Sequence, residues 1–250
     1  PPTFVGVANY QTAFFEDNLV WPSLGRTLKY ALAVVPLGLA GSLVLAMLLN
    51  RGLKGTNIYR TLFYLPALTP TVATALLWQW LLHPVIGPVN ASLEWFGIDG
   101  PGWMVSEQWA LPALVIMNLW SSMGSTRMLI FLAALQGVPQ SLLEAAEIDG
   151  AGRMAKFWHI TVPVISPTIL FNLVMGVIRA LKVFASAFVA TEGGPSYATW
   201  FYALHIYNQA FKYFRLGYGS ALAWIFVVVL LIFTFVQLRL SRSGVVYAGE

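Results

Sequence analysis

Five long uncharged runs of apolar residues constrain the fold of this chain more than any other feature. They are Tyr30–Leu49, Thr61–Leu82, Gln108–Thr126, Phe157–Ile178 and Leu216–Leu238. A helix that crosses the roughly 30 Å hydrocarbon core of a bilayer needs about 20 apolar residues. The third run continues past Arg127 to about Gln136. Transmembrane β-barrels alternate apolar and polar residues, and none of these runs does. We therefore expect an all-α, polytopic transmembrane helical bundle with five spans.

The composition excludes a water-soluble domain. Hydrophobic residues make up 58% of the chain and charged residues only 10%, whereas soluble domains carry roughly 25% charged residues. Cysteine is absent, so neither a disulfide framework nor a thiolate metal site is possible. The net charge of +4 fits the basic cytoplasmic loops of a membrane protein more simply than it fits a nucleic-acid partner, and we expect none.

The loops between the runs differ in their basic residues, which indicates the orientation. The basic loops and tail carry Arg51, Lys54 and Arg60, then Arg153 and Lys156, and finally Arg239 and Arg242. The loop His83–Glu107 has no Lys or Arg. By the positive-inside rule we expect the basic loops and the C-terminus in the cytoplasm and the N-terminus outside, although Lys212 and Arg215 go against the rule. An outward N-terminus before five spans predicts a sixth span ahead of Pro1.

One charged segment, "SLLEAAEIDGAGRMAKFWHITVP" at Ser141–Pro163, separates two apolar runs. Ser141 and Glu144 have the spacing of a capping box, which predicts a short helix from about Leu142. Gly150 suits the left-handed position that ends a helix. Asp149 is then expected to cap a second helix that runs to about Thr161. The residues alone leave two roles open, a compact knob that enters a groove on a partner and a connector that lies on the lipid surface.

Enzyme motifs are missing from the sequence. The histidines His83, His159 and His205 are far apart, and no HExxH pair predicts a zinc site. Neither a GxSxG nucleophile elbow nor a GxxxxGK[ST] phosphate loop occurs. We therefore expect a transport subunit that is not an enzyme. If transport uses ATP, the ATPase must be another subunit.

The charged segment resembles the EAA loop of bacterial ABC importer permeases. The family pattern runs EAA, three residues, G, about nine residues, then I, x, x, x and P, and its matches here are Glu144, Ala145, Ala146, Gly150, Ile160 and Pro163–Pro167, with the triplet Asp149, Gly150 and Ala151. The segments "FVGVANY", "YRTLFYLPALTPTVATALLWQWLL", "TEGGP", "IYNQAF" and "LGYGSALAW" resemble the carbohydrate-uptake branch, the relatives of the maltose and glycerol-phosphate permeases. The resemblance covers nearly the whole chain.

This resemblance implies a MetI-like permease fold, with residues 1–250 as one permease domain in a bacterial cytoplasmic (inner) membrane. The coupling loop at about 139–163 would seat in a cleft of a cytoplasmic ATPase through Glu144, Ala145, Ala146, Asp149, Gly150 and Ala151. The implied partners are a second permease, two ATPase subunits, an extracytoplasmic solute-binding protein and membrane lipid. The binding protein would meet the outer loops His83–Glu107 and Thr191–Leu216. No cofactor is expected in this chain, because the partner ATPase would bind ATP and Mg²⁺.

The implied function is ATP-driven import of a sugar or related carbohydrate by alternating access. The alternative is a secondary transporter without an ATPase, which would use intramembrane carboxylates for ion coupling. No Asp or Glu lies inside the five runs, which argues against that alternative.

Polar residues inside the runs are candidates for the solute pathway. Asn118, Ser121, Ser122 and Ser125 recur at intervals of three and four beside Trp120, and Asn172 lies in the fourth run. Helix–helix hydrogen bonds would explain them equally well. Arg179 and Lys182 lie at the expected outer end of the fourth span. They either extend to the membrane surface or pair with Glu192 or the binding protein, or they line the outer cavity and select an anionic solute. The residues leave these alternatives open.

Overall fold

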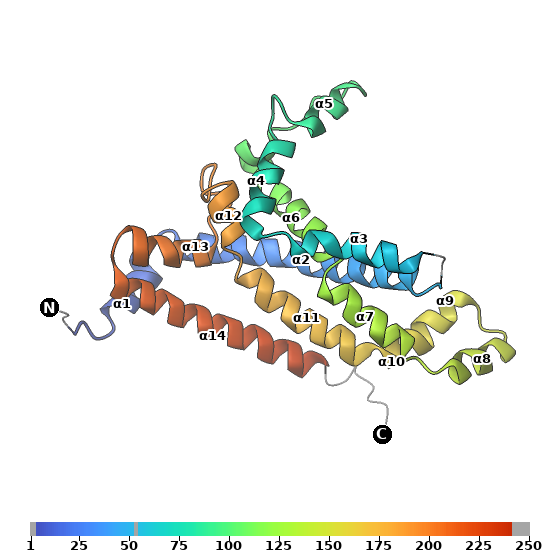
Figure 1. Ribbon diagram of the computed structural model, residues 1–250. Coiled ribbons are helices and arrows are strands. Elements are labelled where there is room, and N and C mark those ends of the chain that lie inside the picture. Colours follow the sequence, from blue (N-terminus) through green and yellow to red (C-terminus); the bar gives the residue numbers. More distant parts are fainter. Residues whose placement is uncertain (1–3, 53–54, 242–250) are drawn as a thin grey trace. The chain divides into compact units, whose positions relative to one another are not determined.

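The computed structural model describes residues 4–52 and 55–241 of the chain. Every regular element in these ranges is a helix (Figure 1), which confirms the all-α prediction. Lys54, Arg242 and the expected span before Pro1 lie outside the described residues.

Three helical stretches of the described chain are long and apolar enough to cross a membrane: α2 at Val20–Leu49, Ser166–Ala190, and α14 at Leu216–Ser241. The second comprises α11 (Ser166–Leu181) and α12 (Ala185–Ala190). Two bent pairs also qualify: α3 (Thr56–Leu68) with α4 (Thr71–Leu81), bent by 95°, and α7 (Thr126–Gln136) with α8 (Gln140–Ile148), bent by 61°. By length and composition the total reaches up to five if each pair is one span, which is roughly consistent with the predicted number. The pair of α7 and α8 is not the predicted third run, Gln108–Thr126, which is mostly α6.

Three of the runs differ in detail from the expected single spans. The second is broken at Thr69, whose backbone is extended, because a residue that precedes a proline disfavours the helical region and Pro70 follows. The third is two helices, α6 (Glu107–Ser122) and α7, with a break at Met123–Ser125. The fourth begins at Ser166, nine positions after the expected start at Phe157.

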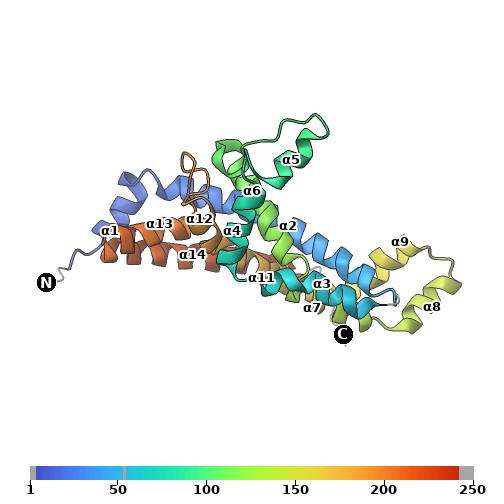
Figure 2. The same ribbon diagram turned by 45° about the horizontal axis from the view of Figure 1, so that its top comes forward.

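Short helices fill the connections between the long ones. They are α1 (Ala8–Gln11), η1 (Thr12–Glu16), α5 (Pro88–Glu94), η2 (Trp103–Val105), α9 (Arg153–Lys156), η3 (Phe157–Thr161), α10 (Val162–Val164), α13 (Tyr202–Tyr207) and η4 (Asn208–Lys212). Within unit 1, α5 stands apart from α13 in both views (Figures 1 and 2).

The chain divides into two compact units, each with its own packed interior. Unit 1 comprises Pro1–Val34, Pro70–Asn118 and Ile178–Phe233, and unit 2 comprises Val35–Thr69, Leu119–Val177 and Thr234–Glu250. The core of unit 2 is formed by Ala46, Leu49, Met128, Phe131, Leu132, Leu135, Val138 and Ile165. In unit 1 the hydroxyl of Thr27 accepts a hydrogen bond from the N–H of Tyr202 (2.9 Å), and Tyr202 donates its own hydroxyl to the carbonyl of Leu222 (3.1 Å).

Candidate functional site

Helices α8 and α9 of unit 2 form a helical hairpin that extends beyond α7 and α10 (Figures 1 and 2). The turn between them is built on Gly150, with φ of 79°. The Ala151 N–H donates to the Ala146 carbonyl (2.8 Å), and the Gly150 N–H donates to the Glu147 carbonyl (3.1 Å). This pair of bonds is the Schellman arrangement that ends a helix at a left-handed glycine. The predicted role of Gly150 in ending the helix is confirmed.

Two other local predictions for this segment are wrong. Helix α8 begins at Gln140 with Pro139 as its N-cap and no side-chain cap, so Ser141 lies inside the helix and forms no capping box. Proline has a fixed φ that favours the start of a helix. Here the helix starts directly after Pro139, two residues earlier in the sequence than the predicted Leu142. Asp149 is the C-cap of α8, and α9 begins only at Arg153 after Gly152.

An ion pair joins the two arms of the hairpin. Lys156 Nζ lies 2.8 Å from Glu147 Oε1. The hydrogen bond from Lys156, together with its positive charge, lowers the pKa of the Glu147 carboxyl. Glu147 is exposed, and exposed pairs add little stability. The pair therefore contributes mainly to the relative orientation of α8 and α9.

Large apolar side chains on the hairpin are solvent-exposed, and the sequence reasoning missed them. On the hairpin Ile148 is 87% exposed and Met154 69%, and Trp158 in the following η3 is 58% exposed. Exposed apolar side chains that cluster together mark interaction surfaces. The six predicted coupling residues lie on the same hairpin: Glu144, Ala145 and Ala146 in α8, and Asp149, Gly150 and Ala151 in the turn. Apolar residues inside a charged loop were the signal available in the sequence.

A cavity of about 530 Å³ opens in unit 2 between α2, α3 and α6, and Trp120 lines it. The other lining residues are Gly41, Val44, Leu45, Leu62, Phe63, Pro66, Leu119, Met123 and Gly124. Among the predicted pathway residues, Trp120 is the one that this cavity includes. Its indole, with the Phe63 ring, offers aromatic surface next to small residues.

The other predicted pathway residues are more dispersed. Ser125 lies beyond the end of α6 and caps α7: its hydroxyl accepts from the Arg127 N–H (3.4 Å) and donates to the Ser122 carbonyl (2.6 Å). The predicted polar stripe therefore does not continue to Ser125 on one helix. Asn172 is buried and donates to the Thr168 carbonyl one turn earlier (3.0 Å). Ser121 and Ser122 are half-buried in unit 2, whereas Asn118, also half-buried, belongs to unit 1.

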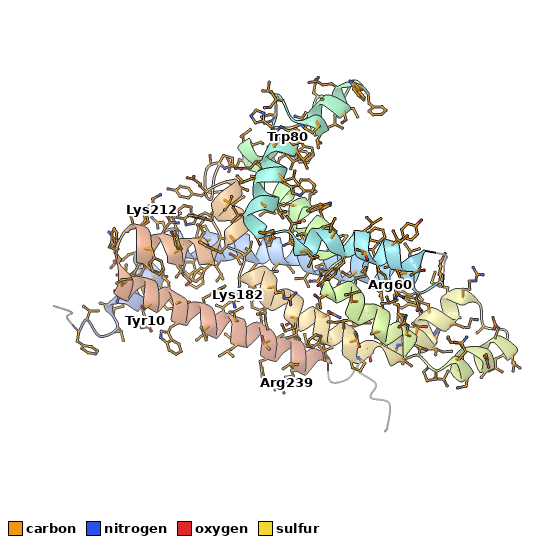
Figure 3. All side chains as sticks on the ribbon, viewed as in Figure 1. Tyr10, Arg60, Trp80, Lys182, Lys212 and Arg239 are labelled. Carbon is orange, nitrogen blue, oxygen red and sulfur yellow. The ribbon has the colours of Figure 1, made fainter. Side chains whose placement is uncertain are left out.

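Arg179 and Lys182 belong to unit 1, and both are exposed. Arg179 lies in the last turn of α11, and Lys182 (labelled in Figure 3) follows the last residue of that helix. Cations at a helix C-terminus interact favourably with its dipole. This position gives both residues a structural reason for their charge and leaves it available to a solute.

Arg127 is a buried cation in unit 2 that the sequence reasoning did not select. It is 8% exposed and lies in the first turn of α7. A Cβ atom at Gly38 of α2 would lie 2.6 Å from its Nη1, and one at Gly176 of α11 would lie 3.5 Å from its Nη2. Two glycines thus make room for the guanidinium. A single arginine inside an apolar run was the available signal, because charges within spans are generally functional.

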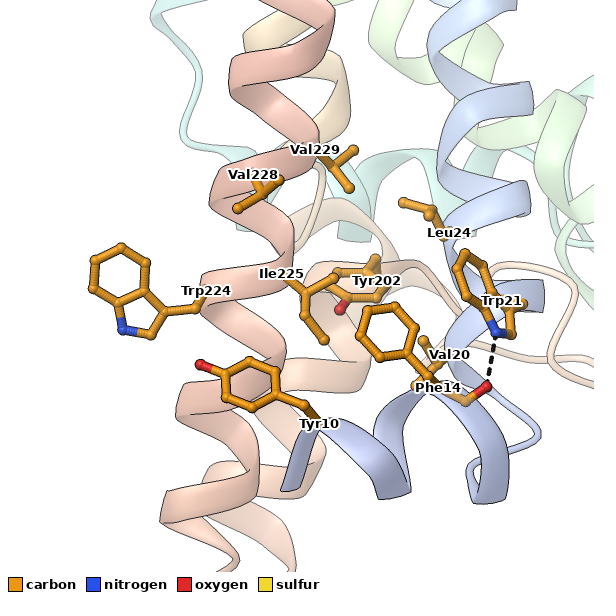
Figure 4. Close-up of a pocket in the computed structure, with 10 residues that line it drawn as sticks. All are labelled: Tyr10, Phe14, Val20, Trp21, Leu24, Tyr202, Trp224, Ile225, Val228 and Val229. Atoms are coloured by element: carbon orange, nitrogen blue, oxygen red, sulfur yellow. Dashed lines mark hydrogen bonds between the residues drawn. The ribbon is translucent and has the colours of Figure 1, made fainter. Parts of the chain in front are cut away.

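A second cavity, of about 480 Å³ in unit 1, does not suit a sugar. Figure 4 shows its lining residues, Tyr10, Phe14, Val20, Trp21, Leu24, Tyr202, Trp224, Ile225, Val228 and Val229. The indole N–H of Trp21 already donates to the Phe14 carbonyl (3.3 Å). A hydroxyl buried without a hydrogen bond costs roughly 2–7 kcal/mol, so the many hydroxyls of a sugar would oppose binding here.

Comparison with known proteins places this geometry among transport proteins. Residues 38–243 match the family model described as "Binding-protein-dependent transport system inner membrane component". The chain is 42% identical to the probable ABC transporter permease protein YesP of Bacillus subtilis, over 100% of this chain and 81% of that protein. It is 35% identical to the sulfoquinovosyl glycerol transport system permease protein SmoG of Agrobacterium fabrum, over 97% and 78%.

A solved structure is similar over nearly the same range. The match is to a chain of a bacterial alginate ABC transporter in complex with an alginate pentasaccharide-bound periplasmic protein. The TM-score is 0.87 with 25% identity, over 96% of this chain and 83% of that chain.

Proposed function

The chain belongs to the family of binding-protein-dependent transport system inner membrane components, and we propose from this premise how it works in a complete importer. It is a multi-pass inner-membrane permease subunit of an ATP-binding-cassette importer for sugars or related carbohydrates, and not an enzyme. The resemblance drawn from its EAA segment is thereby confirmed. The observation that carries the mechanism is the α8–α9 hairpin, a helical turn on Gly150 with exposed apolar side chains on either side of it.

The hairpin is the element through which the ATPase drives the permease. Its exposed Ile148 and Met154 are suited to fill pockets in a partner, as buried anchors do in protein interfaces. In this arrangement residues 139–163 and the C-terminus lie in the cytoplasm. The full complex has a second permease, two ATPase subunits that bind ATP and Mg²⁺, and an extracytoplasmic solute-binding protein.

The binding protein would dock on the outer loops, His83–Glu107 and Thr191–Leu216. In the first of these loops Trp95 is 86% exposed and Phe96 79% exposed. Aromatic side chains are enriched at protein interfaces, and their exposure in a loop without Lys or Arg supports contact with a partner.

Reconstitution in proteoliposomes tests the function. The purified permease pair, ATPase and binding protein are expected to take up a radiolabelled sugar only with ATP on the ATPase side. Uptake driven by an ion gradient without ATP would support the secondary-transporter alternative and contradict the proposal.

We further propose that the solute carries an acidic group. A second similar solved structure is of a transporter described as involved in the import of the acidic polysaccharide alginate, and SmoG is named for sulfoquinovosyl glycerol. In this chain Arg179 and Lys182 of unit 1 carry exposed positive charges that can meet an acidic solute.

Replacement of Arg179 and Lys182 by glutamine tests this charge preference. Loss of two exposed cations removes about 1 kcal/mol or less each, so uptake of a uronate-containing disaccharide should fall roughly 3- to 10-fold relative to a neutral one. Initial uptake rates of the two solutes give the ratio. Arg239→Gln is the matched control, because Arg239 is also an exposed cation in the last turn of a long helix. Equal effects on both solutes would assign Arg179 and Lys182 a structural role only.

Single cysteines test whether the Trp120 cavity belongs to the pathway. Because the chain has no native cysteine, Trp120→Cys can be labelled without background. We expect a membrane-impermeant thiol reagent to modify it and the solute to protect it. Leu231→Cys is the control, because Leu231 is an apolar residue of α14 that is 63% exposed. Labelling at Trp120 no faster than at Leu231 would reject the pathway role of this cavity.

A further inference from the structure

Asp17 of unit 1 lies between η1 and α2 and accepts three hydrogen bonds. Its Oδ1 accepts from the Leu19 N–H (2.9 Å). Its Oδ2 lies 2.9 Å from His205 Nε2 in α13 and accepts from the hydroxyl of Tyr218 in α14 (2.7 Å). One carboxylate therefore joins three segments that are far apart in the sequence.

The other ring nitrogen of His205 determines its protonation state. Nδ1 accepts a hydrogen bond from the indole N–H of Trp200 (3.2 Å). An indole nitrogen can only donate, so Nδ1 must carry no proton, and the ring proton is on Nε2, where it is donated to Asp17. If Nδ1 were protonated, its N–H would face the indole N–H of Trp200, and two donors cannot form a hydrogen bond with each other. His205 is fully buried among the described residues, so solvent cannot accept a hydrogen bond from a protonated Nδ1 in place of Trp200.

The electrostatics agree with a neutral His205 next to an ionised Asp17. Burial lowers the pKa of His205, and the charge and hydrogen bond of Asp17 offset this only in part. Burial alone would raise the pKa of Asp17, but the hydrogen bonds that it accepts from Tyr218, Leu19 and His205 lower it overall. The other ionisable groups that interact with this cluster are Tyr202, through Asp17 and Tyr218, and Arg215, through Tyr218.

Trp200 connects this cluster to the loop Thr191–Phe201. Its ring packs directly on Gly193, where an added Cβ atom would collide with the indole. Within the loop, the Thr199 hydroxyl donates to the Gly194 carbonyl (2.8 Å). Glu192, Ser196 and Tyr197 adopt positive φ, which is costly for residues other than glycine and persists only where surrounding contacts impose it. The loop conformation therefore depends on how Trp200 is held.

We propose that Asp17 and His205 are positioning residues that hold the loop Thr191–Phe201 in its docking conformation through Trp200, and that proton uptake by His205 releases the loop. The unfolded His205 binds a proton with an ordinary pKa of 6.5, and the folded one binds it less readily. The stabilisation of the loop by His205 is thus complete at pH values above 6.5 and weakens as the pH falls below that value. The consequence for uptake rests on the proposed function, since that loop is part of the proposed docking surface of the binding protein.

Hydrogen exchange of the full chain in lipid nanodiscs tests the release. After correction for intrinsic rates, we expect the amides of Thr191–Phe201 to exchange about tenfold faster at pH 5.5 than at pH 7.5. In His205→Gln, the side-chain amide can accept from Trp200 and donate to Asp17 but cannot titrate, so protection should be independent of pH. In Trp200→Phe the ring remains but the donor is lost, and exchange should be fast at both pH values. A pH-independent wild type, or a His205→Gln variant that keeps the wild-type pH dependence, would overturn the proposal.

The affinity of the permease for the binding protein separates this proposal from the proposal that the binding protein docks on this loop. We expect the affinity of the permease for the binding protein to fall at pH 5.5 in the wild type but not in His205→Gln. The binding protein measured alone is the reference for its own response to pH. Faster exchange of the loop with unchanged affinity would support the positioning role and contradict docking at this loop.

Discussion

Replacement of Gly150 by leucine is expected to abolish solute uptake while the permease stays in the membrane. Gly150 has φ of 79°, a conformation that costs a residue with a side chain roughly 1–2 kcal/mol. Leucine would therefore shift the turn between α8 and α9, and with it the exposed Ile148 at the end of α8. Loss of an interface anchor costs about 2 kcal/mol or more, which corresponds to a roughly 30-fold weaker contact with the ATPase. Uptake and the transport-stimulated ATPase rate of the reconstituted complex measure the effect.

Gly6→Leu is the matched control for this variant. Gly6 also has positive φ, and like Gly150 it has no atom within 4 Å of an added Cβ, so it introduces the same backbone cost outside the hairpin. We expect Gly6→Leu to retain uptake. Wild-type uptake in Gly150→Leu would contradict the coupling role of the hairpin. Failure of paired cysteines on the hairpin and the ATPase to cross-link would do the same.

Replacement of Gly124 by alanine is expected to destabilise unit 2. Gly124 lies in the break between α6 and α7, and an added Cβ would collide with the backbone carbonyl of Phe63 in α3. A backbone atom cannot rotate away as a side chain can, so α3 or the break must move. Overpacking of this kind costs about 1–3 kcal/mol, and a protein of this size loses about 2–4 °C in Tm for each kcal/mol. Thermal unfolding in detergent measures the shift.

Gly137→Ala provides the comparison for Gly124→Ala. The nearest atom to a Cβ at Gly137 is the Ala134 carbonyl oxygen at 3.4 Å, which is an ordinary contact. We expect its Tm to remain close to that of the wild type. A Tm for Gly124→Ala that matches that of Gly137→Ala would show that α3 does not approach the break so closely.

The features that could be predicted from sequence depend on local chemistry or on the solvent. Apolar runs of spanning length predicted the membrane helices, because backbone groups in hydrocarbon must be satisfied within the helix itself. Gly150 predicted the turn of the hairpin, because a left-handed position penalises every residue with a side chain. The capping box failed where two local signals competed and Pro139 began the helix before Ser141.

Tertiary structure alone decided which distant residues meet. Asp17 and His205 are 188 positions apart, and neither belongs to a motif that would have paired them. Arg127 is visible in the sequence as an interruption, but its burial depends on two glycines from α2 and α11. Hydropathy and turn residues determine where helices form, since each acts within a few positions along the chain. They carry no information on which helix faces touch, because side-chain packing between helices determines those contacts.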